Sequence, residues 1–495
     1  MPEDALVNTG ATVWPDEDSA YAVVRGMQTK LHRWAGADAA RRFDDLYNLV
    51  YDPAFLMHAW ERVSSNKGAR TAGVDRVTVA WVRTGIGVEE FLGRIRDLLK
   101  TGQYRPMPVR RVQIPKANGK VRTLGIPTVA DRVVQASLTL VLEPIFEADF
   151  RSCSYGFRPR RRAQDAIAEI HHLASRPSNY GWVLEADIAA CFDEIDHTAL
   201  MGRVRRRVKD KRVCALVKAF LKSGVMTTLG EREDTYRGTP QGGILSPLLA
   251  NIALSALDDH FDRQWRDLMG TGGRRANRKR KGLGNWRLIR YADDFVVMVS
   301  GEQRHALALR EEVAAVLARV GLRLSPEKTR VVHIDEGLNF LGFHIRRMRK
   351  RGTNMFYVYT TPSRKAVQAI KDAVKVKTHR STLHMDLDEL IIGVNQTLRG
   401  WANYFRYAVA KAIFAAVDYH AWGRLMRWIR AKYQGRGRLG MAQMRRRFCD
   451  QGWRFAHNGA IFTGASSVPV TRYRYRGSKI PTPWPTTPTP TTSDG

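Results

Sequence analysis

The stretch that most restricts how this chain can fold is Tyr291-Ala292-Asp293-Asp294, because short β-prone runs flank it on both sides. Leu288-Ile289-Arg290 precedes it, and Phe295-Val296-Val297-Met298-Val299 follows it. This order predicts a strand, a tight turn and a second strand, with two adjacent acids at the tip. Paired carboxylates suit a divalent cation, but Asp is also common in turns because its side chain bonds to nearby backbone. The stretch alone leaves both interpretations open.

The charge balance indicates a polyanionic partner. The 495 residues include 81 Lys and Arg against 48 Asp and Glu, which gives a formal net charge of +33 and a pI of about 10.4. Such an excess favours nucleic acid, because each neutralised phosphate releases counterions. No apolar run approaches the roughly 18 residues of a membrane span, so we expect a soluble protein with no membrane partner.

The cysteines and the start of the chain bear on the compartment. Four scattered cysteines without a Cys-x-x-Cys pair suggest neither a disulfide framework nor a cysteine zinc site. The first 20 residues are acidic and lack the basic and apolar regions of a signal peptide. A reducing cytoplasm is therefore the expected location.

Further β patterns appear before the acid pair. Residues 109–115 and 121–126 alternate around Asn118-Gly119, which predicts a hairpin. Residues 182–188 are typical of a buried strand that ends near Asp187. If this strand and the acid hairpin are neighbours in one sheet, Asp187 and Asp293 converge although 106 residues separate them. Two Mg²⁺ ions held there could support nucleotidyl transfer.

Three segments have a basic or biased composition. Residues 64–75 form a small, polar loop that either touches a phosphate backbone or is an ordinary connection. Residues 271–285 are a basic insertion, expected to be disordered or ordered by RNA. Arg472 to Arg476 alternate with tyrosines, which suits either stacking on single strands or an exposed edge strand. The Pro- and Thr-rich residues 481–495 are expected to be disordered.

Motifs in a fixed order make the chain resemble the reverse transcriptases, and most closely the reverse transcriptase and maturase encoded by bacterial group II introns. The resemblance covers roughly residues 40 to 440. It is carried by Ile114-Pro115-Lys116, Gly119-Lys120-Val121-Arg122, Leu124-Gly125-Ile126-Pro127-Thr128, Asp131-Arg132, Ser154-Tyr155-Gly156-Phe157-Arg158-Pro159, Asp187-Ile188, Cys191-Phe192, Gly238-Thr239-Pro240-Gln241-Gly242-Gly243, Tyr291-Ala292-Asp293-Asp294, Glu327-Lys328-Thr329, Phe340-Leu341-Gly342-Phe343 and Leu398-Arg399-Gly400-Trp401-Ala402-Asn403-Tyr404-Phe405.

The resemblance implies an α+β right-hand polymerase fold, in which fingers and a palm, an antiparallel sheet flanked by helices, precede an α-helical thumb/maturase domain. The expected divisions are an N-terminal helical extension with a template-clamping loop at 1–85, fingers and palm at 86–350, and thumb/maturase at 351–445. A basic DNA-binding segment and the Pro/Thr tail would occupy 446–495.

The resemblance also implies a set of site residues. Asp187, Asp293 and, less directly, Asp294 would be catalytic and hold two Mg²⁺ ions, with Mn²⁺ as a substitute and the Ile188 carbonyl as a further ligand. Substrate contacts would come from Lys116 and Arg122 at the triphosphate, Phe192 beneath the sugar where it excludes a 2′-hydroxyl, Gln241 in the nucleotide pocket, and Lys328 at the substrate or the hairpin. Nucleic acid would be contacted by Asn66, Lys67, Arg70, Arg158, Tyr291 and Arg399.

The function implied is an RNA-directed DNA polymerase of the bacterial cytoplasm that binds its group II intron RNA, assists splicing and supports retrohoming by target-primed reverse transcription. Its partners would be the intron RNA, an RNA template with a DNA primer, a DNA target and dNTPs. The alternatives are a defence- or CRISPR-associated reverse transcriptase and a non-catalytic RNA-binding splicing factor. An RNA replicase is disfavoured by Phe192 and by Ala292 ahead of the acids.

One departure from the family concerns its DNA endonuclease domain, which carries paired cysteines and histidines. After about residue 445 this chain has only Cys449 and His457, without that spacing. We therefore expect that the protein does not cut the second DNA strand and that mobility primes from an existing end. Protein-dependent nicking of the bottom strand of a duplex target would contradict this expectation.

Overall fold

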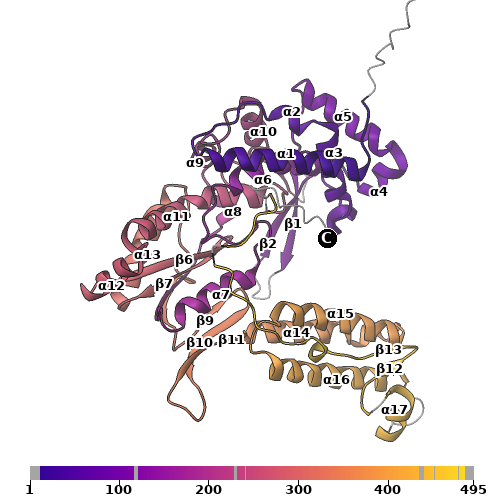
Figure 1. Ribbon diagram of the computed structural model, residues 1–495. Helices are drawn as coiled ribbons and strands as arrows, with labels where there is room; N and C mark the ends of the chain where they lie inside the picture. Colours follow the sequence, from indigo (N-terminus) through magenta and orange to yellow (C-terminus); the bar gives the residue numbers. More distant parts are fainter. Residues whose placement is uncertain are drawn as a thin grey trace, which may run out of the picture.

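The computed structural model describes residues 12–115, 121–227, 231–239, 241–433, 440–450, 452–477 and 479–484. Figure 1 shows three tiers, with N-terminal helices above, a central sheet with its helices, and a helical bundle below. This arrangement confirms the predicted α+β class. Within the described part of the chain, no helix is both long and apolar enough to cross a membrane.

The upper tier packs helices around one buried helix, α6 (Val129–Glu147). Thr128 caps α6, and its hydroxyl accepts a hydrogen bond from the Asp131 amide at 3.0 Å. Nearly all residues of α6 are buried, because it packs against α1 and α3 on several sides. The other helices here are α1 (Glu17–Ala37), α2 (Tyr47–Val50), α3 (Pro53–Ser64), η1 (Lys67–Arg70), α4 (Val79–Trp81), η2 (Val82–Ile86), α5 (Val88–Lys100) and α10 (Lys211–Leu221).

The fingers sheet has the strand order β2-β1-β4-β5 and is built on the predicted hairpin. In it β1 (Val109–Pro115) and β2 (Val121–Ile126) pair antiparallel, while the Asn118-Gly119 turn lies outside the described residues. Two short strands, β4 (Val225–Met226) and β5 (Arg232–Glu233), extend the sheet.

The palm sheet has the order β6-β7-β3-β8 and lies at the centre of the molecule. Its strands are β6 (Asn285–Tyr291), β7 (Asp294–Ser300), β3 (Trp182–Asp187) and β8 (Arg330–His333). Phe295, Val297 and Val299 of β7 pack into the core shared with the upper tier, whereas Val296 and Met298 pack into the core shared with the thumb. Side chains alternate across a strand, so this continuous apolar run is buried on both faces.

Helices cover both faces of the palm sheet. They are α7 (Ala163–Ala174), α8 (Cys191–Glu194), α9 (His197–Val204), α11 (Ser246–Met269), α12 (Gly272–Arg280) and α13 (Gln303–Ala318). The expectation that residues 271–285 form a disordered or RNA-ordered loop is wrong, because 272–280 are helical. Thr271 caps α12, and the guanidinium groups of Arg275 and Arg278 lie over the rings of Trp265 and Trp286.

The lower tier follows a second hairpin, β10 (Phe343–Arg349) and β11 (Phe356–Pro362), which pairs with β9 (Leu338–Phe340). The predicted boundary near 350 falls between these two strands. The bundle contains α14 (Arg364–Lys377), η3 (Arg380–Thr382), α15 (Leu387–Phe405), α16 (Lys411–Tyr433) and α17 (Met441–Phe448), with β12 (Ala456–His457), β13 (Ala460–Ile461) and η4 (Ala465–Ser467) beside it.

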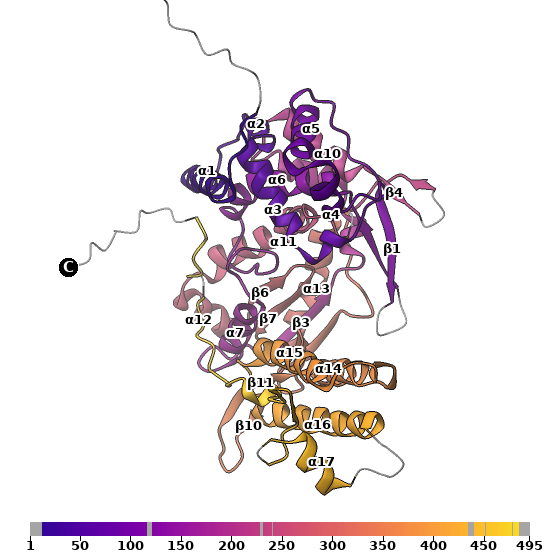
Figure 2. The ribbon, with the colours of Figure 1, turned by 90° about the vertical axis from the view of Figure 1, so that its right-hand side faces the viewer.

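Residues 468–477 and 479–484, called the strap below, run from the bundle back across α7 to α1 (Figures 1 and 2, yellow). Trp484 is buried, and its indole Nε1 donates to Gln28 Oε1 of α1 at 3.1 Å. The expected disorder of 481–495 is therefore wrong for 481–484, because the Trp484 ring packs against Gln28 and His32 of α1. Residues 485–495 lie outside the described chain.

Candidate active site

The palm sheet brings the two predicted acids together. β3 pairs antiparallel with β7 so that Asp187 lies directly opposite Asp294. Tyr291 pairs with Asp294 across the β6–β7 hairpin, which leaves Ala292 and Asp293 as the turn. Ala292 has φ = 57°, a left-handed conformation that an Ala rarely adopts. The predicted strand–turn–strand and its neighbour β3 are both confirmed.

The carboxylates form a crowded anionic site. Burial of the Asp294 carboxylate is the main cause that raises its pKa to about 6, and repulsion from Asp293 and Asp187 adds to the rise. Lys328 was expected to contact either the substrate or the hairpin. In the structure its Nζ forms an ion pair with the Asp187 carboxylate.

The carboxylates at the ends of β3 and β7 can be tested as ligands for a metal ion. Among the described residues, no three Asp, Glu, His or Cys side chains form a ready-made metal cage. Mg²⁺ commonly uses one or two carboxylates and completes its shell with substrate phosphates, so a hard-oxygen pair on adjacent strands fits it.

The backbone at Ile188 is oriented toward the same site. The Asp187 carbonyl accepts from the Ser325 amide at 2.8 Å, and the Ala189 amide donates to Arg323 at 3.0 Å. Because successive peptide groups in a strand point to opposite edges, the Ile188 carbonyl faces the β7 side of the sheet. Its predicted role as a ligand is compatible with this direction.

A buried arginine that the sequence reasoning missed holds the acid turn. Arg290 is 0% exposed and donates to both Asp258 carboxylate oxygens, at 2.8 and 2.5 Å. Its Nη1 also donates to the Ala292 carbonyl at 2.8 Å and to Asn251 Oδ1 at 3.0 Å, while Nη2 donates to Ser154 Oγ at 2.7 Å. The turn therefore rests on a buried ion pair between β6 and α11.

The loop at residues 153–157 braces the same turn from its other side. The Tyr155 amide donates to the Arg290 carbonyl at 2.8 Å, and the Arg290 amide donates to Cys153 at 2.8 Å. A Cβ on Gly156 would collide with the Ala292 backbone nitrogen, so only glycine fits at this contact. The Ser154-Tyr155-Gly156 motif is thus explained by its packing against the acid turn.

The elements of the predicted nucleotide pocket meet beside this turn. Phe192 on α8 is half-buried and packs edge-on against Phe157, with ring centroids 6.5 Å apart. The Thr239 amide donates to the Phe192 carbonyl at 2.6 Å, and a Cβ on Gly238 would collide with that carbonyl. Gln241 Nε2 donates to Asp193 at 3.2 Å, and the Gln241 carbonyl accepts from Gly125 of β2 at 2.8 Å.

Two predicted substrate residues cannot be placed by their side chains. Lys116 lies outside the described residues. The backbone of Arg122 lies in β2, opposite Ile114. Their triphosphate role stays a prediction.

The prediction that Arg158 contacts nucleic acid is wrong. Arg158 is 6% exposed and donates to both carboxylate oxygens of Glu147, at 2.9 and 2.7 Å. Its remaining donors bond to the carbonyls of Arg151, Ser154 and Phe150. All of its donors are used inside the protein, so it is a structural residue.

The other predicted nucleic-acid residues lie at the surface or beside the thumb. Asn66, Lys67 and Arg70 are exposed at the short helix η1, where the carbonyls of Gly68 and Thr71 accept from Arg132 at 2.8 and 2.5 Å. Arg399 is exposed on α15. Tyr291 is half-buried. Burial of the Tyr404 hydroxyl on α15, and electrostatic repulsion from the nearby Tyr291, raise the pKa of Tyr404 to about 12.

Comparisons with known proteins agree with this geometry. Residues 114–345 match the family described as reverse transcriptase (RNA-dependent DNA polymerase), and residues 367–448 match the maturase-specific domain of group II introns. Protein YkfC of Escherichia coli is 38% identical over 365 residues, which cover 70% of this chain and 94% of that protein.

Two further relatives carry intron names. The group II intron-encoded protein LtrA of Lactococcus lactis is 32% identical over 433 residues, covering 74% of this chain and 71% of LtrA. Nuclear intron maturase 1 of Arabidopsis thaliana is 26% identical over 334 residues, covering 50% of this chain and 46% of that protein. The expected right-hand polymerase fold is confirmed. The chain belongs to the group II intron-encoded reverse transcriptases with a maturase-specific domain, and it is an RNA-directed DNA polymerase.

Proposed function

We propose that the protein copies RNA into DNA at the Asp187–Asp293 site, binds its group II intron RNA, assists splicing and supports retrohoming by target-primed reverse transcription. The observation that carries the polymerase centre is the pairing of Asp187 with Asp294 across β3 and β7, which places Asp293 at the adjoining turn. The partners proposed are intron RNA, an RNA template with a DNA primer, a DNA target and dNTPs, in a bacterial cytoplasm.

Asp187 and Asp293 would hold two Mg²⁺ ions, or Mn²⁺ in their place, with Asp294 and the Ile188 carbonyl nearby. Bound ions of this kind lower the charge barrier between a 3′-hydroxyl and a nucleotide triphosphate. Lys328 holds a positive charge against Asp187, which limits repulsion among the acids.

The neighbouring elements would orient the substrates. Phe192 would lie beneath the sugar, where its ring excludes a 2′-hydroxyl, and Gln241 would line the pocket beside β2. Lys116 and Arg122 would hold the triphosphate. Tyr291 would pack at the primer end, while Asn66, Lys67, Arg70 and Arg399 would contact nucleic acid from the fingers loop and the thumb.

Asp293→Ala tests the proposal. We expect it to abolish Mg²⁺-dependent extension of a DNA primer on an RNA template, while the affinity for RNA stays near that of the wild type. The matched control is Asp267→Ala, since Asp267 is an exposed aspartate on α11. Equal loss of extension and RNA affinity in Asp293→Ala would show that the residue is structural and would refute its catalytic role.

The retained acids argue against a splicing factor without catalysis. A wild-type protein that binds RNA and assists splicing but extends no primer would favour that alternative. A gene not flanked by group II intron RNA domains would favour a defence- or CRISPR-associated polymerase of the same chemistry.

A further inference from the structure

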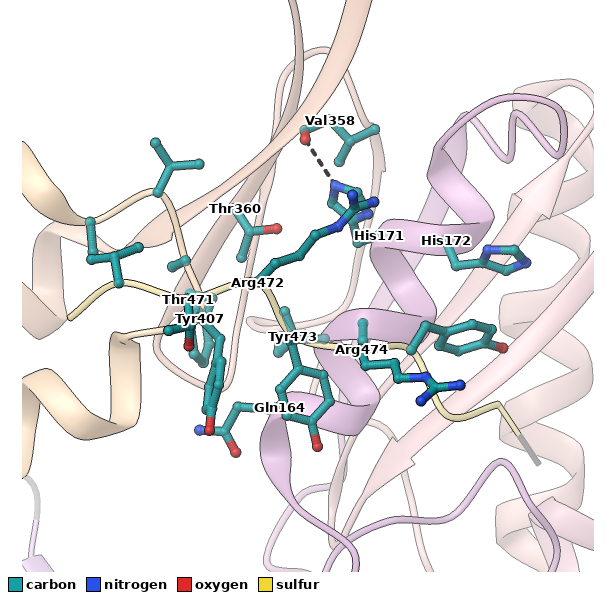
Figure 3. Close-up of a pocket in the computed structure, with 18 of the residues that line it drawn as sticks. Gln164, His171, His172, Val358, Thr360, Tyr407, Thr471, Arg472, Tyr473 and Arg474 are labelled. Atoms are coloured by element: carbon teal, nitrogen blue, oxygen red, sulfur yellow. Dashed lines mark hydrogen bonds between the residues drawn. The ribbon is translucent and has the colours of Figure 1, made fainter. Parts of the chain in front are cut away.

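A cavity lies on the palm face that the strap crosses. It has a volume of about 900 Å³ and is bounded by α7, β11, the start of α16 and residues 470–475 of the strap, and it will be called the strap groove. Figure 3 shows His171 and His172 on α7, Thr360 on β11, and Thr471 to Arg474 on the strap, with Arg472 reaching toward His171. Its volume falls within the range of about 300–1,000 Å³ typical of ligand sites.

The strap groove is strongly cationic. Its exposed positive side chains are Arg176, Lys411, Arg472 and Arg474. No Asp or Glu occurs among its described lining residues. Burial lowers the pKa of His171, and the positive charge of Arg472 lowers it further, which is the direction expected where cations crowd. Such a lining attracts phosphates.

The strap holds these arginines in a fixed orientation. Asp165 accepts hydrogen bonds from the Tyr473 hydroxyl at 2.8 Å and from Arg476 at 2.8 and 2.6 Å. Tyr475 stacks on His172, with ring centroids 4.5 Å apart and an interplanar angle of 16°. Tyr473 and Tyr475 therefore hold the strap against α7, while Arg472 reaches toward His171 and Arg474 stays exposed at the groove (Figure 3). The sequence left two alternatives for this segment, stacking on single strands or an exposed edge strand. In the structure residues 472–476 form no β-strand, and the two tyrosines contact Asp165 and His172 of α7.

We propose that the strap groove binds a single-stranded RNA segment through its phosphates, at a site separate from the template–primer cleft. The volume admits a few nucleotides of single strand and excludes a duplex. Arg472 and Arg474 would pair with consecutive phosphates. The choice of RNA, and its assignment to the intron, rest on the proposed function, whereas the cationic site itself does not.

The experiment uses the full chain with its cleft saturated by an RNA-template/DNA-primer hybrid. The probe is a fluorescein-labelled 12-nucleotide oligouridylate, and binding is followed by fluorescence anisotropy as the salt concentration is varied. The variant Arg472→Ala/Arg474→Ala keeps Tyr473 and Arg476, which hold the strap. The matched control, Arg263→Ala/Arg319→Ala, removes two exposed arginines that line a different cavity, beside α9.

Each phosphate contact of a single strand contributes about 0.7 to the slope of log K against log salt. The double variant should therefore lose about 1.4 from the slope and bind about 25-fold more weakly at 0.1 M salt. The control should match the wild type.

Three results would overturn the proposal. The first is wild-type affinity and slope in the double variant. The second is tighter binding of a DNA probe of the same length, which would assign the groove to DNA. The third is a loss of primer extension on the pre-bound hybrid that equals the loss of probe binding in the double variant, which would place both arginines in the cleft. Anisotropy reports binding whether or not the protein extends a primer, so failure of the polymerase proposal would be seen separately.

Discussion

Replacement of Arg290 by methionine tests whether a buried ion pair positions the catalytic turn. Arg290 and Asp258 are both 0% exposed and share two hydrogen bonds. The same guanidinium donates to the Ala292 carbonyl, one residue before Asp293. Arg290→Met removes the charge and the donor together while keeping an unbranched apolar side chain of similar length.

The expected loss can be estimated from this geometry. Removing one member of a buried pair leaves an uncompensated charge and costs about 3–5 kcal/mol of unfolding free energy. The double variant Arg290→Met/Asp258→Met removes both charges, so it should recover most of that loss. Neither variant restores the hydrogen bond to Ala292. A shift of about 1 Å in a reacting group costs about 100-fold in rate, and we expect both variants to lose about that much.

Two assays separate stability from positioning. In urea unfolding, the unfolding free energy of the double variant should be close to that of the wild type and well above that of Arg290→Met. Single-nucleotide incorporation on an RNA template with a DNA primer should be slow in both variants, with little change in primer binding. Wild-type incorporation by the double variant would refute the reasoning, because the turn would then need no donor from position 290.

Two further perturbations address the sugar pocket and the strap. Phe192→Ala should raise the use of ribonucleotides relative to deoxynucleotides in a primer-extension competition, since the ring would no longer exclude a 2′-hydroxyl; unchanged discrimination would remove Phe192 from this role. Trp484→Ala should lower the unfolding free energy in urea by about 3–5 kcal/mol, because a buried indole leaves a cavity against Gln28 and His32. The control Trp81→Ala, at a half-exposed tryptophan, should change the unfolding free energy by about 0.5 kcal/mol or less. Equal losses of unfolding free energy in the two variants would contradict a docking role for Trp484.

The parts of the fold that sequence alone predicted are those with a local pattern. The β6–β7 hairpin follows from apolar runs around Asp293-Asp294, and the β1–β2 hairpin follows from alternating runs around Asn118-Gly119. The convergence of Asp187 with the hairpin also followed, because strand ends and hairpin tips are the places where a sheet displays side chains. The resemblance to reverse transcriptases supplied the order of the remaining motifs.

The parts that sequence did not predict depend on distant partners. Arg158 and Arg290 have the composition of surface residues, and only Glu147 and Asp258 make their burial possible. Residues 272–280 were expected to be a loop because they are basic, yet Trp265 and Trp286 supply ring faces for Arg275 and Arg278. The docking of Trp484 joins positions 456 residues apart, which no local pattern encodes.

The two-sided burial of β7 has a mechanical consequence. Alternate side chains of one strand belong to the core of the fingers and to the core of the thumb, so neither core can loosen without exposing the back of the strand that begins at Asp294. The two halves of the molecule should therefore lose their amide-exchange protection together, as one cooperative unit, while the surface hairpin tip at 350–354 exchanges freely. Rigidity at the acids is thus a property shared by the entire sheet.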